Sequence, residues 1–294
     1  MRLVFHGVRG SFPSARASTW RYGGNTAVAS VWVDHEPLIL LDFGSGLPDV
    51  DPTDSSVSQT TGRIVAFVSH LHLDHVIGLP FFPPLHQEGT ELDIYGPPQP
   101  SGSLADAFAA LIRPPFFPLQ LADVRATVRF HEVFEDDLAV GGVKVKVRPV
   151  PHLGPTVGYR FEQDGFAFAY VSDHQAPPSF EGVSDPVLEL CDGVDVLIHE
   201  AQYTHEEFAR KPDWGHCTPA YALLVAKESV ARCLCLYHHD PRRSDEELDS
   251  ILADIRQESE GTPVAEILAA AEGMSLARTG SVTPSRLIKG GGER

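Results

Sequence analysis

Hydrophobic residues along the first third of the chain fall into short runs separated by polar turns. Thr26–Val33 and Leu38–Phe43 are rich in apolar and β-branched residues, and a polar turn lies between them. This pattern predicts two neighbouring strands. Ile64–Ser69 is apolar almost throughout, which is typical of a strand covered on both faces. The polar segment Asp49–Gly62 between these runs is predicted to be a surface loop.

The segment 80–120 has a less regular pattern. Ser103–Ile112 places apolar residues at helical spacing, and Pro114 and Pro115 would end that helix. The flanking sequence is rich in Pro and Phe. We therefore expect an irregular apolar wall around a single helix in this segment.

The second half alternates strand-like and helix-like patterns. A cap residue followed by proline, Thr218-Pro219, predicts a helix that leads into a strand at Cys233–Tyr237, and Ser244 with Glu247 forms a capping box for a last helix. Further strands are predicted at Val143–Val150, Tyr159–Phe161, Phe166–Ser172 and Val194–Ile198. The whole pattern favours an α/β fold in which two mixed β-sheets are flanked by helices. We expect one domain over residues 1–278 and a flexible C-terminal tail over 279–294.

Composition narrows the function classes. The chain has 294 residues, of which 43% are hydrophobic and 21% charged, so it can bury a sizeable core. With 23 Lys and Arg against 40 Asp and Glu, the net charge of −17 disfavours binding of long nucleic acid. No apolar run approaches the roughly 18 residues that cross a bilayer, and no signal-peptide pattern is seen, so we expect a cytoplasmic protein away from membranes. The four cysteines are expected to be reduced and buried.

A dense cluster of metal-ligand residues follows the predicted strand Ile64–Ser69. The run from Ser69 to His75 reads Ser-His-Leu-His-Leu-Asp-His. His70 and His72 are two residues apart, so an extended chain points both side chains the same way. Asp74 and His75 lie where the chain is expected to turn into a helix, and they can face a second ion. Imidazole and carboxylate suit zinc, manganese or iron, so the run predicts two adjacent metal ions.

This His-x-His-x-Asp-His run resembles the metallo-β-lactamase superfamily of metal-dependent hydrolases, whose fold is an αββα sandwich. The resemblance extends to further motifs in chain order and covers nearly all of the chain up to about Arg278. It implies that His152, Asp173 and His238 complete the ligand set, and that Asp42 supports the metal loop by hydrogen bonds. The resemblance further implies how the ligands divide between two ions. One ion would be bound by His70, His72, His152 and Asp173, and the other by Asp74, His75, Asp173 and His238.

Two adjacent histidines leave the last ligand open between His238 and His239. The resemblance favours His238, because the family's ligand directly follows the strand. His239, His174 and His199 are then expected near the ligands or in the pocket.

Two further motifs resemble the ribonuclease Z-like and phosphodiesterase branch. These are His-Glu-Ala at 199–201 and Gly-His-Cys-Thr at 215–218, where Gln202 and Cys217 replace the Thr and Ser of that branch. The resemblance implies that His216 reaches the scissile phosphate and can protonate the leaving group, while Glu200 orients it. Asp74 would orient the attacking water. The segments Phe5–Pro13 and Tyr22–Thr26 also resemble this branch, and their nearest cations, Arg9 and Arg21, are candidates for contacting the phosphate.

These inferences predict a hydrolase with two divalent ions, most simply Zn²⁺ with Mn²⁺ or Fe as alternatives. A hydroxide held between the ions would cleave a phosphodiester in a small anionic substrate, such as a cyclic nucleotide, a short nucleotide or a cyclic sugar phosphate. The open alternatives are hydrolysis of a lactone, thioester or β-lactam, ribonuclease Z-like RNA processing, and a non-hydrolytic metal or redox role. A homodimer is compatible with the sequence. The aromatic residues that could stack a nucleobase are Phe81, Phe82, Phe116 and Phe117.

Overall fold

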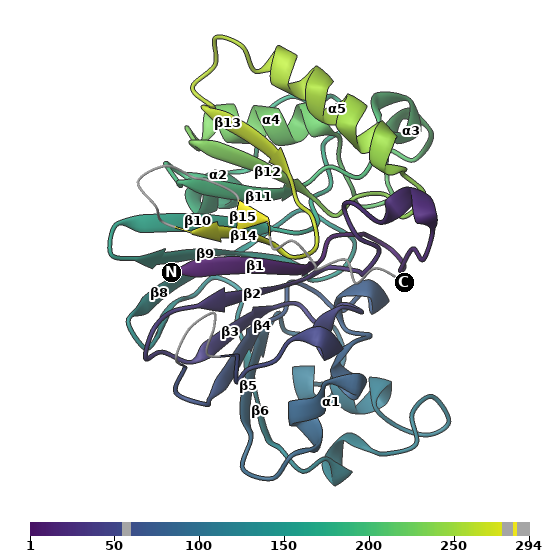
Figure 1. The fold of residues 1–294 in the computed structure, drawn as a ribbon, viewed down its shortest axis with the longest axis vertical. Helices are drawn as coiled ribbons and strands as arrows, with labels where there is room; N and C mark the ends of the chain where they lie inside the picture. Colours follow the sequence, from purple (N-terminus) through teal and green to yellow (C-terminus); the bar gives the residue numbers. More distant parts are fainter. Residues whose placement is uncertain (55–59, 278–284, 287–294) are drawn as a thin grey trace, which may run out of the picture.

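Two mixed β-sheets packed face to face form the centre of the molecule, with helices on their outer sides (Figure 1). The computed structural model describes residues 1–54, 60–277 and 285–286. The architecture is the α/β sandwich that the sequence predicts.

The first sheet has eight strands in the order β15-β14-β1-β2-β3-β4-β5-β6. Strands β3 to β6 run parallel to one another, whereas β1, β2 and β14 pair in antiparallel fashion. The bounds are β1 Arg2–Gly7, β2 Val28–Trp32, β3 Leu38–Leu41, β4 Ile64–Phe67, β5 Glu91–Gly96, β6 Thr127–Glu132, β14 Met274–Ala277 and β15 Ser285–Arg286.

The second sheet has seven strands in the order β13-β12-β11-β10-β9-β8-β7. Its half from β10 to β13 is parallel, and its half from β7 to β10 is antiparallel. The bounds are β7 Asp137–Val140, β8 Val143–Pro149, β9 Val157–Gln163, β10 Phe166–Val171, β11 Val196–Glu200, β12 Cys233–Tyr237 and β13 Glu266–Ala269.

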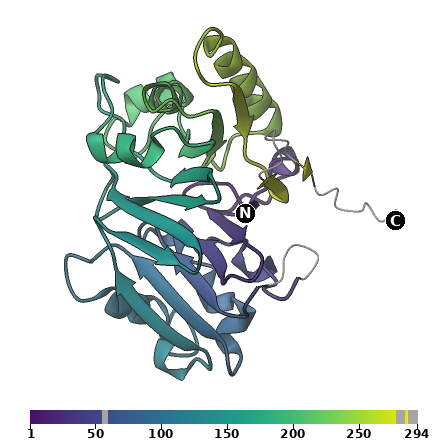
Figure 2. The ribbon, with the colours of Figure 1, turned by 90° about the vertical axis from the view of Figure 1, so that its left-hand side faces the viewer.

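Five α-helices of the described chain pack outside the sheets. The second sheet is covered by α2, α4 and α5, and α1 packs on β6 of the first sheet. In Figure 2 the green and olive helices of residues 205–258 lie together at the top of the view. The bounds are α1 Leu104–Leu111, α2 Asp185–Cys191, α3 His205–Arg210, α4 Pro219–Glu228 and α5 Asp245–Glu258.

The largest apolar cluster lies between the two sheets. Phe67 of β4 packs its ring against Tyr159 and Phe161 of β9, with centroid distances of 5.1 and 5.3 Å. Each ring of this kind contributes about 1.5–3 kcal/mol when it is fully buried. This core fixes one sheet against the other, and therefore also the loops that leave them.

Several predicted elements are confirmed. Thr218 and Ser244 cap α4 and α5, and β12 has the predicted bounds Cys233–Tyr237. All four cysteines are free and buried.

Two predictions are corrected. The segment 80–120 is not only an irregular wall, because β5 crosses it as an inner strand between β4 and β6. Its two buried aliphatic side chains, Leu92 and Ile94, form too short an alternation to be recognised. The chain at Leu73–His75 forms one 3₁₀ turn rather than the start of an α-helix.

Most of the predicted tail, 279–294, lies outside the described residues. Its described part, Ser285–Arg286, pairs with β14. Within the described residues no helix is both long and apolar enough to span a bilayer.

Candidate metal centre

The candidate ligands stand at the carboxyl ends of strands, along one edge of the sandwich. Because β10, β11 and β12 are parallel, their carboxyl ends meet at the same edge, and there they present Asp173, Glu200 and His238. Asp42 and the run from His70 to His75 follow the parallel strands β3 and β4. The hydroxyl of Tyr170 in β10 donates to Asp42 Oδ2 at 2.8 Å, which joins the two edges.

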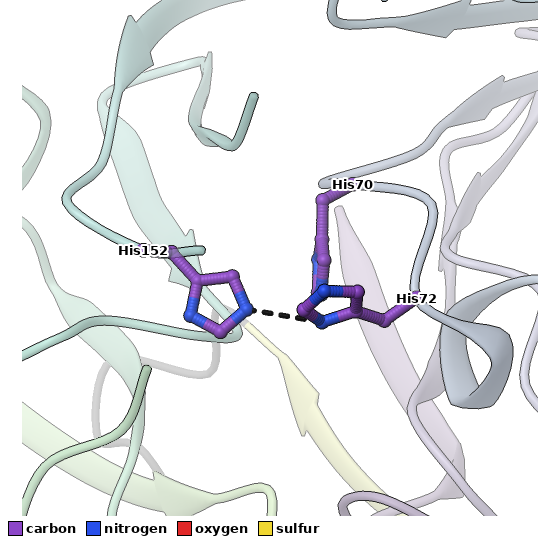
Figure 3. A group of neighbouring side chains, drawn as sticks. All are labelled: His70, His72 and His152. Carbon is purple, nitrogen blue, oxygen red and sulfur yellow. Dashed lines mark hydrogen bonds between the residues drawn. The ribbon is translucent and has the colours of Figure 1, made fainter. Parts of the chain in front are cut away.

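His70, His72 and His152 form the first group. His152 faces the other two rings from the opposite side, and its Nε2 lies 3.1 Å from His72 Nδ1 (Figure 3). One nitrogen from each ring lies within 4.8 Å of the others. Asp173 Oδ1 is 4.0 Å from His70 Nε2 and 3.8 Å from His152 Nε2. This group could surround one ion.

Asp74, His75 and His238 form the second group. Asp74 Oδ2 lies 3.3 Å from His75 Nε2 and 3.2 Å from His238 Nε2. Asp173 Oδ2 is 3.1 Å from His75 Nε2, and its Oδ1 is 3.5 Å from His238 Nε2. Asp173 therefore reaches both groups, and the structure brings all seven predicted ligands together.

Buried polar atoms without a hydrogen-bond partner point into this cluster. Among them are His70 Nε2 and Asp173 Oδ2. Unpaired buried polar atoms are costly, and a coordinated cation would satisfy them. His152 Nδ1 donates to the carbonyl of Gly215 at 2.6 Å, which leaves its Nε2 free to bind an ion. The donor set of imidazole nitrogens and carboxylate oxygens fits two divalent ions of the zinc, manganese or iron type.

Asp42 lies behind the second group. It accepts hydrogen bonds from the backbone and hydroxyl of Ser69 at 2.7 and 2.9 Å, and from His75 Nδ1 at 2.8 Å. Its φ of 57° lies in the left-handed region, which turns its side chain back toward the loop. Asp42 is placed to orient His75 rather than to contact an ion.

The two adjacent histidines after β12 point to different places. His238 faces Asp74 and Asp173, and its backbone has a φ of 54°. His239 donates from Nε2 to the carbonyl of Ala270 at 3.0 Å, and its ring meets the Tyr22 ring edge-on. The structure therefore places His238 beside the ligands.

His216 lies beside the ligand cluster and is held by Glu200. Its Nδ1 is 3.2 Å from Glu200 Oε1 and 3.6 Å from Asp173 Oδ1. Glu200 is completely buried and also accepts from the backbone nitrogen of Cys217 at 3.2 Å. Asp173, His216 and His238 also satisfy the spacing of a metal-ligand group.

His174 and His199 form a buried pair beside Glu200. His174 Nδ1 and His199 Nε2 are 3.0 Å apart, and His199 Nδ1 donates to the Glu200 carbonyl at 2.8 Å. The backbone nitrogen of His174 donates to Glu200 Oε1 at 2.6 Å. Both histidines therefore help to fix Glu200.

Residues 41–239 match the family described as the Beta-lactamase superfamily domain. The chain belongs to this family. It is also similar to a ribonuclease Z of Brevibacillus brevis, with 29% identity over 237 residues that cover 66% of this chain and 73% of the relative.

Solved structures show the same fold. The short form of human tRNase Z has a TM-score of 0.65 and 21% identity, and the match covers 94% of this chain and 99% of that one. A diphosphatase of the PhnP family has a TM-score of 0.67 and 20% identity, with coverage of 97% and 99%. At these identities, the two structures support the fold alone.

The protonation states of the histidines and aspartates in the cluster depend on one another. Burial alone would lower the pKa of His75, but the carboxylates of Asp173 and Asp74 raise it well above its usual value. In return, nearby imidazoles hold the pKa of Asp173 well below its usual value, against the effect of burial. Burial lowers the pKa of His70 and of His152, which favours the neutral rings that bind metals. His75 and His238 likewise hold the pKa of Asp74 well below its usual value against the effect of burial, so both carboxylates are held ionised, as ligands must be.

The N-terminal loop contributes contacts that sequence reasoning missed. The backbone nitrogen of Ser11 donates to Asp74 Oδ2 at 2.6 Å, from a residue with a φ of 63°. A Cβ on Gly10 would lie 2.3 Å from His238 Cε1. The Gly-Ser pair in this loop was the available signal, but only the fold shows that it touches the ligands.

Two arginines near the motifs, Arg9 and Arg21, already bind other groups of the protein. The buried Arg9 donates to the carbonyls of Gly23 at 2.7 Å and Arg243 at 2.8 Å. Arg21 forms an ion pair with Asp249 at 2.6 Å. These contacts leave the expected phosphate role of either arginine without support.

The four phenylalanines suggested for base stacking differ in exposure. Phe82 is completely buried, so it belongs to the core, whereas Phe81 and Phe116 are exposed. Phe117 packs edge-on against Phe81 with centroids 5.6 Å apart.

Proposed function

We propose that this chain is a di-metal phosphodiesterase that acts on a small anionic substrate, such as a cyclic nucleotide, a short nucleotide or a cyclic sugar phosphate. The observation that carries the proposal is the His216–Glu200 pair, placed beside a cluster that already holds seven candidate ligands. Such a pair supplies a positioned proton donor next to a metal centre, which is what cleavage of a phosphodiester needs for its leaving alkoxide.

When bound, two divalent ions supply an activated water nucleophile and neutralise charge on the phosphoryl oxygens. The protein's own side chains orient the water and supply the proton. Asp74, held by the Ser11 backbone, accepts a hydrogen bond from the attacking water and orients it. Glu200 fixes His216 through Nδ1, so that Nε2 faces the substrate. The carboxylates of Glu200 and Asp173 overcome the effect of burial and raise the pKa of His216 to about 9, so it carries a proton to give at neutral pH.

The net charge favours a small phosphate compound over a long nucleic acid. A chain with a net charge of −17 repels a polyanion along most of its surface. The ribonuclease Z relative supports chemistry at a phosphodiester, and it also makes RNA processing the second candidate function.

The test is turnover of bis-p-nitrophenyl phosphate combined with metal analysis by mass spectrometry, for wild type, His216→Ala and a control, His205→Ala. His205 begins α3 and its ring packs against Phe180 at 5.6 Å, away from the ligands. We expect about two ions per chain in all three proteins. Turnover should fall by about 10²–10⁴-fold in His216→Ala alone.

Four other results would redirect the proposal. Unchanged turnover in His216→Ala would contradict the role of His216 as the proton donor. Loss of an ion from this variant would make His216 a ligand. Rapid cleavage of a p-nitrophenyl ester or nitrocefin, without phosphodiester turnover, would favour a lactone, thioester or β-lactam hydrolase. Cleavage of a precursor tRNA in preference to small diesters would favour the RNA-processing candidate.

The same mass spectrum identifies the bound metal. We propose Zn²⁺, with Mn²⁺ or Fe as the alternatives. A predominance of iron would favour the redox role over hydrolysis. Light scattering of the purified protein tests the proposed homodimer.

A further inference from the structure

One lysine beside the metal centre is held between two aromatic rings. The Lys211 ammonium lies 4.5 Å from the centre of the Tyr203 ring and 5.0 Å from that of Trp214. Its backbone nitrogen closes the last turn of α3 by donating to the carbonyl of Phe208. A ring face attracts a cation, so the two rings restrict where the ammonium can lie.

These rings belong to the wall of the candidate site. Tyr203 is buried and meets the His216 ring edge-on, with centroids 5.3 Å apart. A single aromatic ring therefore separates the Lys211 ammonium from the His216 imidazole. Trp214 is 58% exposed and precedes Gly215, whose carbonyl holds His152. The lysine thus borders the site on its His216 side.

Lys211 differs from the arginines near the site in its charge partners. Arg9, Arg21 and Arg243 each lie within salt-bridge distance of a carboxylate. No described carboxylate lies within that distance of the Lys211 ammonium. The aromatic faces attract this cation but leave its charge unpaired and its N–H groups available. In a chain with a net charge of −17, an ammonium without a carboxylate partner next to the candidate proton donor is a natural contact for an anion.

We propose that Lys211, held by Tyr203 and Trp214, binds a second anionic group of the substrate, separate from the phosphodiester that is cleaved. This inference rests on the proposed function and narrows its substrate class. The preferred substrate carries a phosphodiester and a further phosphate or carboxylate on the same small molecule. A cyclic mononucleotide, which has only one phosphate, would then be a poorer substrate than a nucleotide with an additional phosphate.

The test uses two substrates that differ only in the second phosphate. One is the p-nitrophenyl ester of thymidine 5′-phosphate, and the other is the same ester with an added 3′-phosphate. The variants are Lys211→Met, which keeps the length of the side chain, and Lys211→Arg, which keeps its charge. Lys227→Met at the exposed end of α4 is the matched control.

For the substrate with two phosphates, we expect Lys211→Met to raise KM about tenfold with little change in kcat, as the loss of one charge-assisted hydrogen bond would. For the substrate with one phosphate, KM should stay within about twofold. Lys211→Arg should recover most of the loss, and Lys227→Met should behave as wild type.

A purely structural role for Lys211 would change both substrates alike, or neither, and either result would overturn the inference. If the wild type cleaves no phosphodiester, the proposed function fails separately. The inference is then decided by calorimetric titration with thymidine 3′,5′-bisphosphate and thymidine 5′-phosphate. An affinity ratio between these two ligands that is the same in wild type and Lys211→Met would refute it.

Discussion

The two sheets contribute to the metal centre in different ways. The eight-stranded sheet supplies four candidate ligands from one continuous run, His70 to His75, directly after β4. The seven-stranded sheet supplies three, His152, Asp173 and His238, each after a different strand. The first set is held by local backbone geometry, and the second depends on the correct order and packing of three strands.

This difference shows which contacts hold the site together. The short run is already fixed by its 3₁₀ turn and by the hydrogen bonds of Asp42. The scattered ligands meet it only because the cores of the two sheets pack together. Asp173, which reaches both ligand groups, is therefore the residue on which the two contributions most depend.

The largest expected effect comes from Asp173→Asn. An amide cannot supply two anionic oxygens to two ions, so both ligand groups should weaken. We expect metal content to fall well below one ion per chain and phosphodiester turnover to fall by about a thousandfold or more. Mass spectrometry of the metal and the bis-p-nitrophenyl phosphate assay measure these two quantities.

His72→Ala is the matched comparison from the continuous run. Since His72 belongs to the first group only, this variant should keep the ion of the second group. If His72→Ala lost both ions and Asp173→Asn lost one, the assignment of Asp173 as the shared residue would be wrong.

A smaller effect is expected from Asp42→Asn, which perturbs the continuous run from behind. The amide nitrogen would face the donors of His75 and Tyr170 in place of a carboxylate oxygen. Metal affinity should weaken by about 10–100-fold, as for other groups that orient a ligand. Competition with a chelator measures this affinity. The exposed Asp254→Asn on α5 is the control, and equal affinities for both variants would show that Asp42 does not position His75.

The smallest expected effect is at Gly10, where the loop after β1 touches a ligand of the opposite sheet. In Gly10→Ala, the new Cβ would lie 2.3 Å from His238 Cε1, so His238 has to move. We expect the free energy of unfolding to fall by about 1–3 kcal/mol, measured by urea denaturation. Gly142→Ala, whose Cβ would meet the flexible ends of Glu36 at 3.0 Å and Gln163 at 3.6 Å, should be near neutral. Equal stability of the two variants would contradict the close contact.

Much of the fold could be predicted from the chain itself, because many of its signals are local. The caps Thr218 and Ser244 mark helix starts within a few residues, and the apolar run before His70 marks a buried strand. The strand β5 was missed because its burial comes from neighbours on both sides rather than from a pattern of its own. Irregular turns such as Leu73–His75 also escape periodicity arguments, because they are too short to repeat.

The sequence by itself determined the chemistry of the site. Residue type and close spacing were enough to predict metal binding at His70, His72, Asp74 and His75, and the resemblance added His152, Asp173 and His238. Only the tertiary structure decided which of His238 and His239 faces the ligands, which cations are already paired, and that Lys211 stands one ring away from His216. The physical reason is that ligand chemistry belongs to single side chains and short spacings. The direction in which a side chain points and the pairing of its charge depend on groups far apart in the chain, which meet only when the two sheets pack.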